Sequence, residues 1–360
     1  MIIRNLRLRN FRNYASLDLD LDPGLNWITG QNAQGKTNLL ESMVCLSLTR
    51  SFRVNDDRKL IRSGCEFADL SCAVESSKEI HLREVIHSGG KTLFINRQAV
   101  TKTSEFIGIL NTVLFSPDDL GIFLDAPMAR RKLLDQEITK VSSGYLYALK
   151  HYRSLLKDRN ALLKQVSPDR SYLDVLDSQM IHESEVIIQE RREFLKRINE
   201  RIQKIYQKLS LSSSELIIQY QCCIKDEDCA SALGRMFETN RERDLEFRMT
   251  GAGIHREDIL FTLDGENVIY GASQGQKRMI LLAMKLAFIP YIEETAGQRP
   301  VLLLDDVLSE LDEQRQKTLL ELIGRGGQCV ITGTGIPDSV KREGFREIRI
   351  DQGRLIGGRQ

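Results

Sequence analysis

The chain has 360 residues, of which 41% are hydrophobic and 28% charged, and its formal net charge is +1. A chain of this length exceeds what one hydrophobic core usually serves, so we expect two or three domains. The near-zero net charge excludes a global basic field, and any nucleic-acid surface must therefore be a local patch. The N-terminus has no signal-peptide core and no run approaches roughly 18 apolar residues, so we expect a cytoplasmic protein without a membrane partner.

Seven cysteines, with no Cys-x-x-Cys pair among them, predict free thiols in a reducing compartment. Cys222, Cys223 and Cys229 lie close together in the sequence, but no His is near them. We therefore interpret these three as buried apolar residues and not as metal ligands.

The first 115 residues read mainly as strands. Alternating apolar residues predict strands over 3–11 and 17–21, and the turn pair Pro23-Gly24 ends the second. A short strand over 25–28 precedes a helix from Asn38 to Leu46. Further strands are predicted over the ranges 67–74, 79–86, 92–95 and 112–115, with a hairpin turn at 88–90.

The middle of the chain has a helical pattern. From 128 to 166 the apolar residues recur at intervals of three or four, which predicts one long amphipathic helix. A second helix, from 178 to 209, carries an apolar residue at every seventh position, although Ser184 and Arg191 interrupt the seam. This pattern predicts one limb of a short antiparallel coiled coil. Its seam residues are Ile181, Ile188, Leu195, Ile202 and Leu209.

Strands and helices alternate again in the last third. The predicted strands are 216–224, 259–263, 301–304 and 329–332, the predicted helices are 274–292 and 311–323, and a closing hairpin surrounds Asp351–Gly353. We expect the two ends of the chain to form one α/β head around an inserted helical arm. The predicted division is 1–126 for the first part of the head, 127–212 for the arm, and 213–360 for the second part of the head.

The segment from Gly30 to Thr37 has the pattern G-x-x-x-x-G-K-[ST] between a predicted strand and a predicted helix, which is typical of a P-loop. Its glycines allow a tight turn whose N–H groups surround phosphate oxygens at the positive end of the helix. Lys36 is expected to reach the β- and γ-phosphates of a nucleotide, and the Thr37 hydroxyl to bind Mg²⁺. The expected ATP contacts are Gly30, Gln31, Asn32, Ala33, Gln34, Gly35, Lys36, Thr37 and Asn38.

Two further patterns fit an ATP site. An apolar run ends in Asp305 and Asp306, where Asp305 would hold Mg²⁺ and Asp306 would orient and deprotonate a water molecule. Alone, this run also fits a strand followed by a solvated acidic turn. Ser273, Gln274, Gly275 and Gln276 open a predicted helix. They form either a simple helix start or an anion site directed at the nucleotide of a second subunit.

The order of these motifs resembles that of ABC-type ATPases: a P-loop, then Ser-x-Gly-Gln at a helix start, an apolar run ending in two acids, and Ser309-Glu-Leu-Asp312. Asn38-Leu-Leu-Glu41 and Leu8-Arg-Asn-Phe-Arg-Asn-Tyr14 resemble the SMC branch. Arg50-Ser-Phe-Arg53, Phe115-Ser-Pro-Asp-Asp-Leu120 and Thr250–Asp258 narrow the resemblance to the RecF family of bacterial recombination mediators.

This resemblance implies an ABC-type, SMC-like ATPase head with a mixed sheet and a helical arm. It implies ATP and Mg²⁺ as cofactors and an ATP-dependent homodimer in which Ser273 and Gly275 contact the nucleotide of the second subunit. It further implies binding to double-stranded DNA and to junctions of double- and single-stranded DNA. The implied protein partners are RecR, with RecO and RecA in the same pathway, and the implied processes are DNA replication, repair, recombination and the SOS response.

The sequence departs from related ATPases near the γ-phosphate. The Gln that senses this phosphate is absent, with Asp118 or Asp119 as candidate substitutes, and Thr332-Gly-Thr334 stands where a switch His is usual. Asp306 replaces a more usual Glu. We therefore expect Lys36, Asp305 and Asp306 to support slow, DNA-stimulated ATP hydrolysis that acts as a switch.

The basic residues of the arm, among them Arg130, Arg191 and Arg192, are interleaved with Glu and favour a solvated helix face. A denser cluster after the P-loop helix is equally consistent with DNA-backbone contacts and with a solvated loop. It comprises Arg50, Arg53, Arg58, Lys59 and Arg62, with Phe52 among them. His255 is either a subunit or nucleotide contact or a structural residue. The alternative functions are the ATPase subunit of an ABC-type membrane transporter and, more weakly, a nuclease-linked SMC-type repair ATPase.

Overall fold

The computed structural model describes residues 1–124, 127–225, 228–324, 326–337 and 344–357. The chain forms two compact units. The first combines Met1–Leu120, Lys204–Ser213 and Gln274–Gln360, and the second combines Gly121–Gln203 and Ser214–Ser273. The predicted boundary at residue 126 lies outside the described residues, and residues 214–273, predicted as part of the head, belong to the second unit.

The first unit contains an antiparallel sheet with the strand order β2-β1-β4-β5-β6-β7. Its strands alternate between buried apolar and more exposed polar residues, as in β4, where Ala68, Leu70, Cys72 and Val74 are all buried. The strands are β1 (Ile2–Phe11), β2 (Tyr14–Asp20), β4 (Phe67–Glu75), β5 (Glu79–His87), β6 (Gly90–Ile95) and β7 (Gln98–Val100). These bounds confirm the predicted strands of this region.

A second, mixed sheet in the same unit has the order β15-β14-β3-β13-β12-β8. The pairs from β14 to β8 are parallel, and only β15 runs antiparallel to its neighbour. Continuous apolar runs form the central strands because both faces are buried. The strands are β3 (Leu25–Thr29), β8 (Thr112–Phe115), β12 (Val301–Asp305), β13 (Cys329–Gly333), β14 (Arg346–Asp351) and β15 (Arg354–Gly357).

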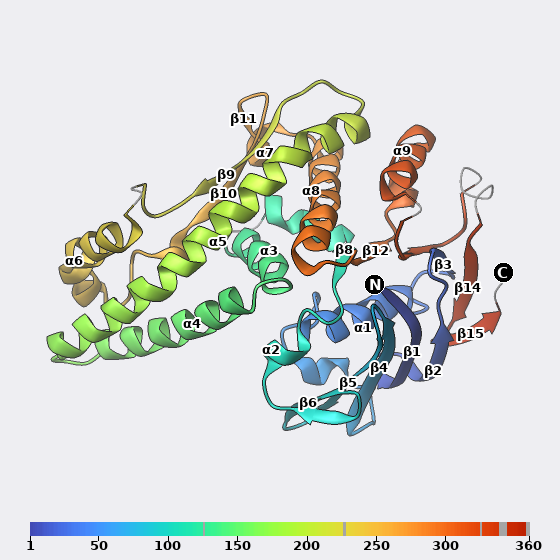
Figure 1. Cartoon of the computed structure of the whole chain (residues 1–360), viewed down its shortest axis with the longest axis horizontal. Helices are drawn as coiled ribbons and strands as arrows, with labels where there is room; N and C mark the ends of the chain where they lie inside the picture. Colours follow the sequence, from blue (N-terminus) through green and yellow to red (C-terminus); the bar gives the residue numbers. More distant parts are fainter. Residues whose placement is uncertain (125–126, 226–227, 325, 338–343, 358–360) are drawn as a thin grey trace. The chain divides into compact units, whose positions relative to one another are not determined.

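Helix α1 (Lys36–Leu48) lies between the two sheets of this unit and contacts β4 and β5 on one side and β8, β12 and β13 on the other (Figure 1). Because sheets cover it on opposite sides, its residues from Leu39 to Leu48 are all buried. Helix α8 (Gln274–Ala296) packs against β8. The remaining helical segments of the unit are η1 (Asp57–Leu60), α2 (Thr103–Phe106), η2 (Pro117–Phe123), η4 (Leu308–Glu310) and α9 (Glu313–Ile323).

The second unit is mainly helical and includes a small sheet, β11-β10-β9. Helices α4 and α5 run antiparallel, since Ser142, His151 and Arg159 bond to Glu190, Glu183 and Asp177 in turn. This antiparallel pair confirms the predicted helical arm. Its elements are α3 (Pro127–Thr139), α4 (Ser143–Leu163), α5 (Arg170–Ser210) except for its last residues from Lys204 on, β9 (Leu216–Gln221), α6 (Cys229–Phe247), η3 (Ile254–Arg256), β10 (Asp258–Leu263), β11 (Glu266–Asn267) and α7 (Val268–Gly271).

Two helix predictions for this unit differ from the structure, and a third helix was missed. The single helix over 128–166 is two helices, because Ser142 caps α4 by accepting a hydrogen bond from the Tyr145 amide at 3.1 Å. The second long helix begins at Arg170, eight residues before the predicted 178. Helix α6 was not predicted at all, although Asp228 caps it through the Ser231 amide.

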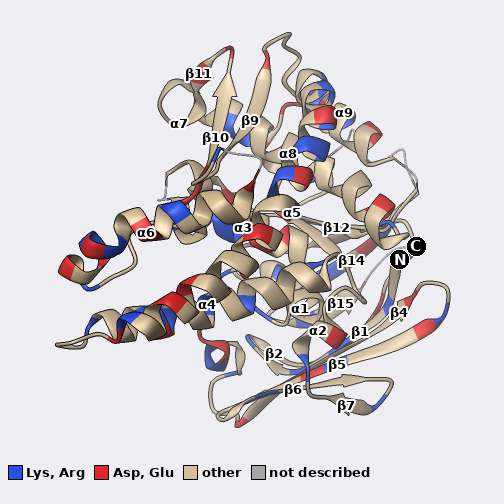
Figure 2. Cartoon of the chain, turned by 60° about the vertical axis from the view of Figure 1, so that its left-hand side comes forward, with Lys and Arg blue, Asp and Glu red and all other residues tan. Residues whose placement is uncertain are grey.

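The expectation of a solvated basic face is wrong for two arginines of the arm. The Arg191 side chain is 2% exposed and donates to Asp135 and Glu257, both at 2.8 Å. Arg130 is also buried and forms a two-point ion pair with Asp258. Other basic residues of α5 follow the expectation, since Lys196, Lys204 and Lys208 are exposed and Arg197 pairs with Glu193 one turn earlier. Figure 2 shows acidic and basic residues interleaved along α4 and α6 as well.

Arg159 is the centre of another buried network in this unit. Its side chain is fully buried, with Nε 2.6 Å from Asp177 and one terminal nitrogen 2.7 Å from Asp244. We predict that Arg159→Met lowers the free energy of unfolding by about 3–5 kcal/mol, because it leaves the buried Asp244 without its cation. Chemical unfolding followed by circular dichroism measures the change.

The control is Arg170→Met, which removes an ion pair with Glu242 from an exposed part of α5. Such pairs contribute little, so this variant should unfold like the unaltered protein. An equal effect of the two substitutions would show that the buried network does not stabilise the unit.

Candidate nucleotide-binding site

The P-loop and the acidic pair meet at one edge of the mixed sheet. The P-loop follows β3, the acids end β12, and β13 pairs in parallel with both strands. Parallel strands present their carboxyl ends at the same edge. A cavity of about 680 Å³ opens there. It is lined by Arg12, Asn13, Asn32, Ala33, Gly35, Lys36, Thr37, Asn38, Arg53, Lys59, Ile61, Asp305 and Asp306.

The Lys36 ammonium group is held by the loop that it belongs to. Its Nζ donates to the carbonyl oxygens of Gly30 at 2.6 Å and Gln31 at 2.9 Å. Burial lowers the pKa of Lys36, and the neighbouring carboxylates of Asp306 and Asp305 oppose that shift. The lysine is thus a buried cation facing two carboxylates across the cavity.

The Asp305 carboxylate joins the P-loop helix to the sheet. Its Oδ1 accepts from the Thr37 hydroxyl at 3.0 Å and from the Thr332 hydroxyl at 2.8 Å. Burial raises the pKa of Asp305, while hydrogen bonds from Thr332 and Thr37 act in the opposite direction. Thr332 also accepts from the Asp306 amide at 3.1 Å, so one hydroxyl orients both acids.

These residues fit a magnesium ion. Mg²⁺ prefers hydroxyl and carboxylate oxygens, which Thr37 and Asp305 bring together. The Asp306 Oδ1 atom is buried without a hydrogen-bond partner among the described residues. An orphaned carboxylate oxygen beside a buried cation indicates a site that completes its polar contacts with a ligand.

The turn between β1 and β2 holds the P-loop through hydrogen bonds, a role that the sequence analysis did not predict. Tyr14 donates to the Gly35 carbonyl at 2.9 Å. Asn13 donates to the Gln34 carbonyl at 3.0 Å and accepts from Asn38 at 2.8 Å. The Asn-Phe-Arg-Asn-Tyr segment was noted as a family resemblance, and that resemblance was the one available signal.

Arg12 was also missed. It adopts a left-handed φ of 53° in this turn and forms a two-point ion pair with the buried Glu41 of α1, at 2.8 and 2.7 Å. It donates as well to the Lys59 carbonyl at 3.0 Å. Arg12 therefore ties the loop after α1 to the P-loop helix and places its own side chain at the cavity.

The other candidate residues are not among those that line this cavity in the described structure. Ser273–Gln276 lie exposed at the start of α8 and do not line it. Asp119 accepts from the Ser116 amide and pairs with Lys285 at 3.3 Å, while Asp118 is exposed. His255 bonds to Tyr152 and to the Thr250 carbonyl, and burial lowers its pKa to about 4, which is the pattern of a structural histidine.

Comparisons with known proteins identify close relatives. A family model described as "RecF/RecN/SMC N terminal domain" matches residues 2–335. The DNA replication and repair protein RecF of Pediococcus pentosaceus is 40% identical over 347 residues, which covers 93% of both chains. The protein of the same name from Lachnoclostridium phytofermentans is 37% identical and covers 99% of this chain and 100% of its own.

The solved structures agree with this result. A structure of the recombination mediator protein RecF with ATP, in the RecFOR pathway, superposes with a TM-score of 0.90 at 32% identity, covering 98% of each chain. An Smc head domain from Pyrococcus furiosus shares the fold alone, with a TM-score of 0.56 at 18% identity.

None of the helices in the described ranges is long and apolar enough to cross a membrane.

Gly30 offers a test of how the P-loop is supported. A Cβ atom at this position would lie 2.3 Å from the carbonyl oxygen of Ile350 in β14. We predict that Gly30→Ala destabilises the protein by about 1–3 kcal/mol, because the strand or the loop has to move. Thermal unfolding measures this loss.

Gly275→Ala is the matched control, since its Cβ would meet no described atom within 4 Å. It should leave the unfolding temperature unchanged. If both variants unfold alike, the close contact between the P-loop and β14 does not limit stability.

Proposed function

Because the chain belongs to the RecF family, we propose that it is an ATP-dependent DNA-binding protein of recombinational repair. In this proposal an ATP-induced homodimer clamps double-stranded DNA near single-stranded gaps and helps to load the recombinase. The observation that carries it is the meeting of Lys36, Thr37, Asp305 and Asp306 at one cavity, in a chain 32% identical to a RecF structure with ATP. Family membership favours this function over a transporter subunit.

Each residue of the cavity then has a role toward ATP. Lys36 leaves the carbonyls of Gly30 and Gln31 and donates to the phosphates, so its positive charge offsets part of their negative charge. The amides of the P-loop at the start of α1 bind phosphate oxygens. Thr37 and Asp305 would hold Mg²⁺, which supplies charge neutralisation at the transferred phosphate.

Slow hydrolysis follows from the acids that are present. Asp306 is the carboxylate available to orient a water molecule, and its backbone stands in a left-handed conformation with φ of 56°. Its side chain is one methylene shorter than that of the usual Glu. Thr332-Gly-Thr334 stands where a switch His is usual, and the Thr332 hydroxyl donates to Asp305 and accepts from the Asp306 amide. Slow, DNA-stimulated turnover fits a protein in which ATP hydrolysis sets when DNA is released better than one in which rapid hydrolysis drives movement.

The homodimer rests on the residues that begin α8. Ser273–Gln276 are exposed, and Gly275 leaves open space in the described structure where a second nucleotide can approach the helix start. Arg278, in the next turn, pairs with Glu310 at 2.8 Å. The ion pair links this helix to the loop that follows Asp306.

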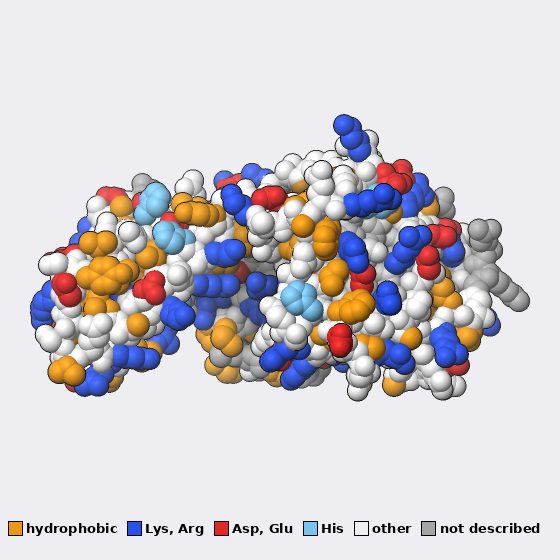
Figure 3. Space-filling view, turned by 90° about the horizontal axis from the view of Figure 1, so that it is seen from below, with side chains coloured by type: hydrophobic (Ala, Val, Ile, Leu, Met, Phe, Trp, Pro, Cys, Tyr) orange, Lys and Arg blue, Asp and Glu red, His pale blue; other side chains and the backbone are white. Residues whose placement is uncertain are grey.

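DNA contacts are proposed for the basic cluster after α1. Arg53 and Lys59 line the cavity, so we propose that they contact the nucleotide. The exposed Arg50 and Arg62 then remain as the residues that contact DNA. Figure 3 shows Lys and Arg scattered over one face with acidic residues among them, as the net charge of +1 requires. Dimerisation would double each local patch. RecR, with RecO and RecA in the same pathway, are the proposed protein partners.

The first test of this proposal is ATP-dependent dimerisation. Ser273→Arg should bind ATP but remain monomeric, because a bulky cation fills the space for the nucleotide of the second subunit. Analytical ultracentrifugation with ATP, with ADP and without nucleotide measures the state, and a fluorescent ATP analogue measures binding.

Two controls bracket this result. Ser88→Arg adds the same side chain at the exposed β5–β6 turn and should dimerise normally. Lys36→Ala should lose both nucleotide binding and the dimer. A Ser273→Arg dimer of unchanged affinity would refute the proposed head-to-tail arrangement.

The second test is the effect of ATP on DNA binding. We predict weak duplex binding without nucleotide and clearly tighter binding with ATP, falling steeply with salt because the contacts are to phosphates. The double variant Arg50→Glu, Arg62→Glu should weaken ATP-dependent binding at least tenfold and reduce its salt dependence. A titration of fluorescent duplex at several salt concentrations measures both.

The control is Lys78→Glu, Lys102→Glu, which changes the net charge equally at exposed positions outside this cluster. Its DNA affinity should fall far less. Equal affinity of the unaltered protein with and without ATP would require the clamp to be abandoned.

A further inference from the structure

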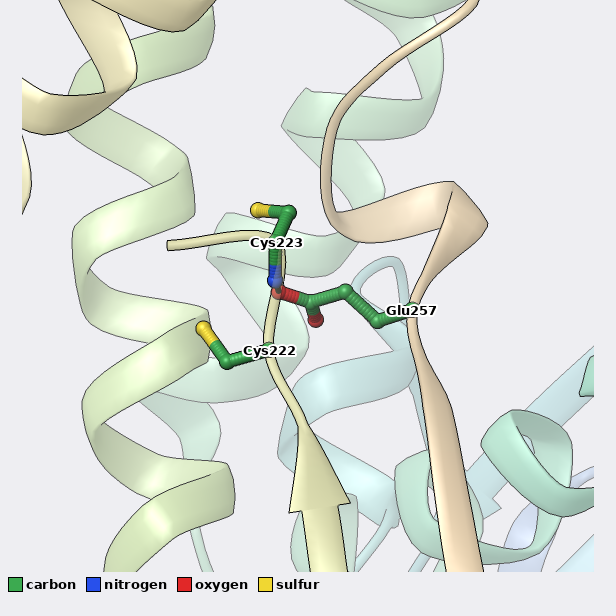
Figure 4. Close-up of side chains that lie close together, drawn as sticks. All are labelled: Cys222, Cys223 and Glu257. Carbon is green, nitrogen blue, oxygen red and sulfur yellow. Dashed lines mark hydrogen bonds between the residues drawn. The ribbon is translucent and has the colours of Figure 1, made fainter. Parts of the chain in front are cut away.

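Three of the seven cysteines lie in the second unit, and Figure 4 shows two of them, Cys222 and Cys223, beside Glu257. Cys222 and Cys223 directly follow β9, and Cys229 is the first residue of α6. The sequence predicted buried apolar residues, but all three are only half-buried. These residues are therefore less buried than Cys45, Cys72 and Cys329, and they have polar neighbours.

The guanidinium group of Arg192 contacts two of these sulfurs. The terminal nitrogens of Arg192 lie 3.6 Å from the Cys229 Sγ and 3.7 Å from the Cys222 Sγ. Arg192 also donates to the Ile224 carbonyl at 3.3 Å, which fixes its position. A guanidinium beside a thiol favours the thiolate, which is the nucleophilic form of cysteine.

Cys223 lies beside a carboxylate group, that of Glu257. The Cys223 amide donates to the buried Glu257 at 3.1 Å. The sulfurs of Cys222 and Cys223 and one Glu257 oxygen all lie within 4.8 Å of one another. The Cys223 side chain lowers the pKa of Cys222, which burial and Glu257 oppose, while Cys222 and burial raise the pKa of Cys223. Because Arg192 reaches the Cys222 sulfur, Cys222 is the thiol of this adjacent pair that a cation favours as thiolate.

A metal ion is a poor fit for this cluster. Both oxygens of Glu257 already accept hydrogen bonds, from the Cys223 amide on one side and from Arg191 and Tyr220 on the other. Arg192 supplies positive charge where a cation would bind. The electrostatics therefore favour a reactive thiolate over a metal ligand.

We propose that Cys222 is an oxidant-reactive thiolate and that Cys229 converts its oxidised form into a disulfide, with Arg192 holding both sulfurs. The oxidant is a peroxide. The Cys222 sulfur attacks one peroxide oxygen, so an S–O bond forms, the O–O bond breaks, and the departing hydroxide takes a proton as water. The Cys229 thiolate then attacks that sulfur, the S–S bond forms as the S–O bond breaks, and the departing hydroxide takes a proton from solvent to give a second water.

Cys229 is a better partner than Cys223 for two reasons. A disulfide between adjacent residues closes a small ring that departs from the preferred Cα separation, whereas six residues lie between Cys222 and Cys229. Arg192 also lies beside the Cys229 sulfur and favours a thiolate there, whereas the Cys223 sulfur has a Glu257 oxygen within 4.8 Å.

The test treats the purified full-length protein with hydrogen peroxide, alkylates the remaining thiols and maps the peptides by mass spectrometry. We expect a Cys222–Cys229 link, while the buried Cys45, Cys72 and Cys329, whose pKa values burial raises, stay reduced. Cys229→Ser should accumulate a sulfenic acid at Cys222 that a 1,3-diketone probe traps. Cys223→Ser should keep the link.

Arg192→Gln tests the role of the guanidinium. In this variant the rate of Cys222 oxidation should fall about threefold. The fraction of Cys222 present as thiolate falls about tenfold, but a less acidic thiol is more nucleophilic once ionised, which partly offsets that loss. Arg197→Gln is the control, because Arg197 lies on the same helix and pairs with Glu193. A Cys222–Cys223 link, or a Cys222 no more reactive than Cys65, would overturn the proposal, as would an unchanged rate in a folded Arg192→Gln protein.

Discussion

The parallel pairing of β3, β13 and β12 is the constraint on which the candidate site depends. In this register Thr332 of β13 lies beside Ile28 of β3 and beside Asp305 of β12. The loop after β3 and the acids at the end of β12 consequently open at the same edge, although 268 residues separate Thr37 from Asp305. A slip of one residue would turn the Asp305 carboxylate to the other face of the sheet and break this contact.

Sequence patterns predicted the elements of this arrangement but not what supports them. Alternating and continuous apolar runs indicate strands because burial decides which residues face the core. The P-loop was found because its glycines and lysine occur at fixed spacing. Its supports are single hydrogen bonds over long separations, such as that from the Gly353 amide to the Gln34 carbonyl at 3.0 Å, and no local pattern encodes them.

The errors in the helical unit have a common cause. Ile138, Val141 and Tyr145 keep the spacing of one amphipathic helix, so the break between α3 and α4 is set by the Ser142 cap and not by hydrophobicity. Arg191 interrupts the heptad seam but stays buried, because Asp135 and Glu257 neutralise it. A pattern that sorts residues by polarity alone cannot recognise a charge whose partners lie elsewhere in the chain.

Arg191 and Arg192 show how one step along a helix changes the chemistry of the same side chain. About 100° of rotation separates neighbouring residues in an α-helix, so the two guanidinium groups face different partners. Arg191 neutralises Glu257, and Glu257 in turn fixes the Cys223 amide at 3.1 Å. Arg192 faces sulfur instead of carboxylate. The buried ion pair thereby fixes the backbone beside Cys222, and the next residue of the same helix brings its guanidinium group to the sulfurs of Cys222 and Cys229.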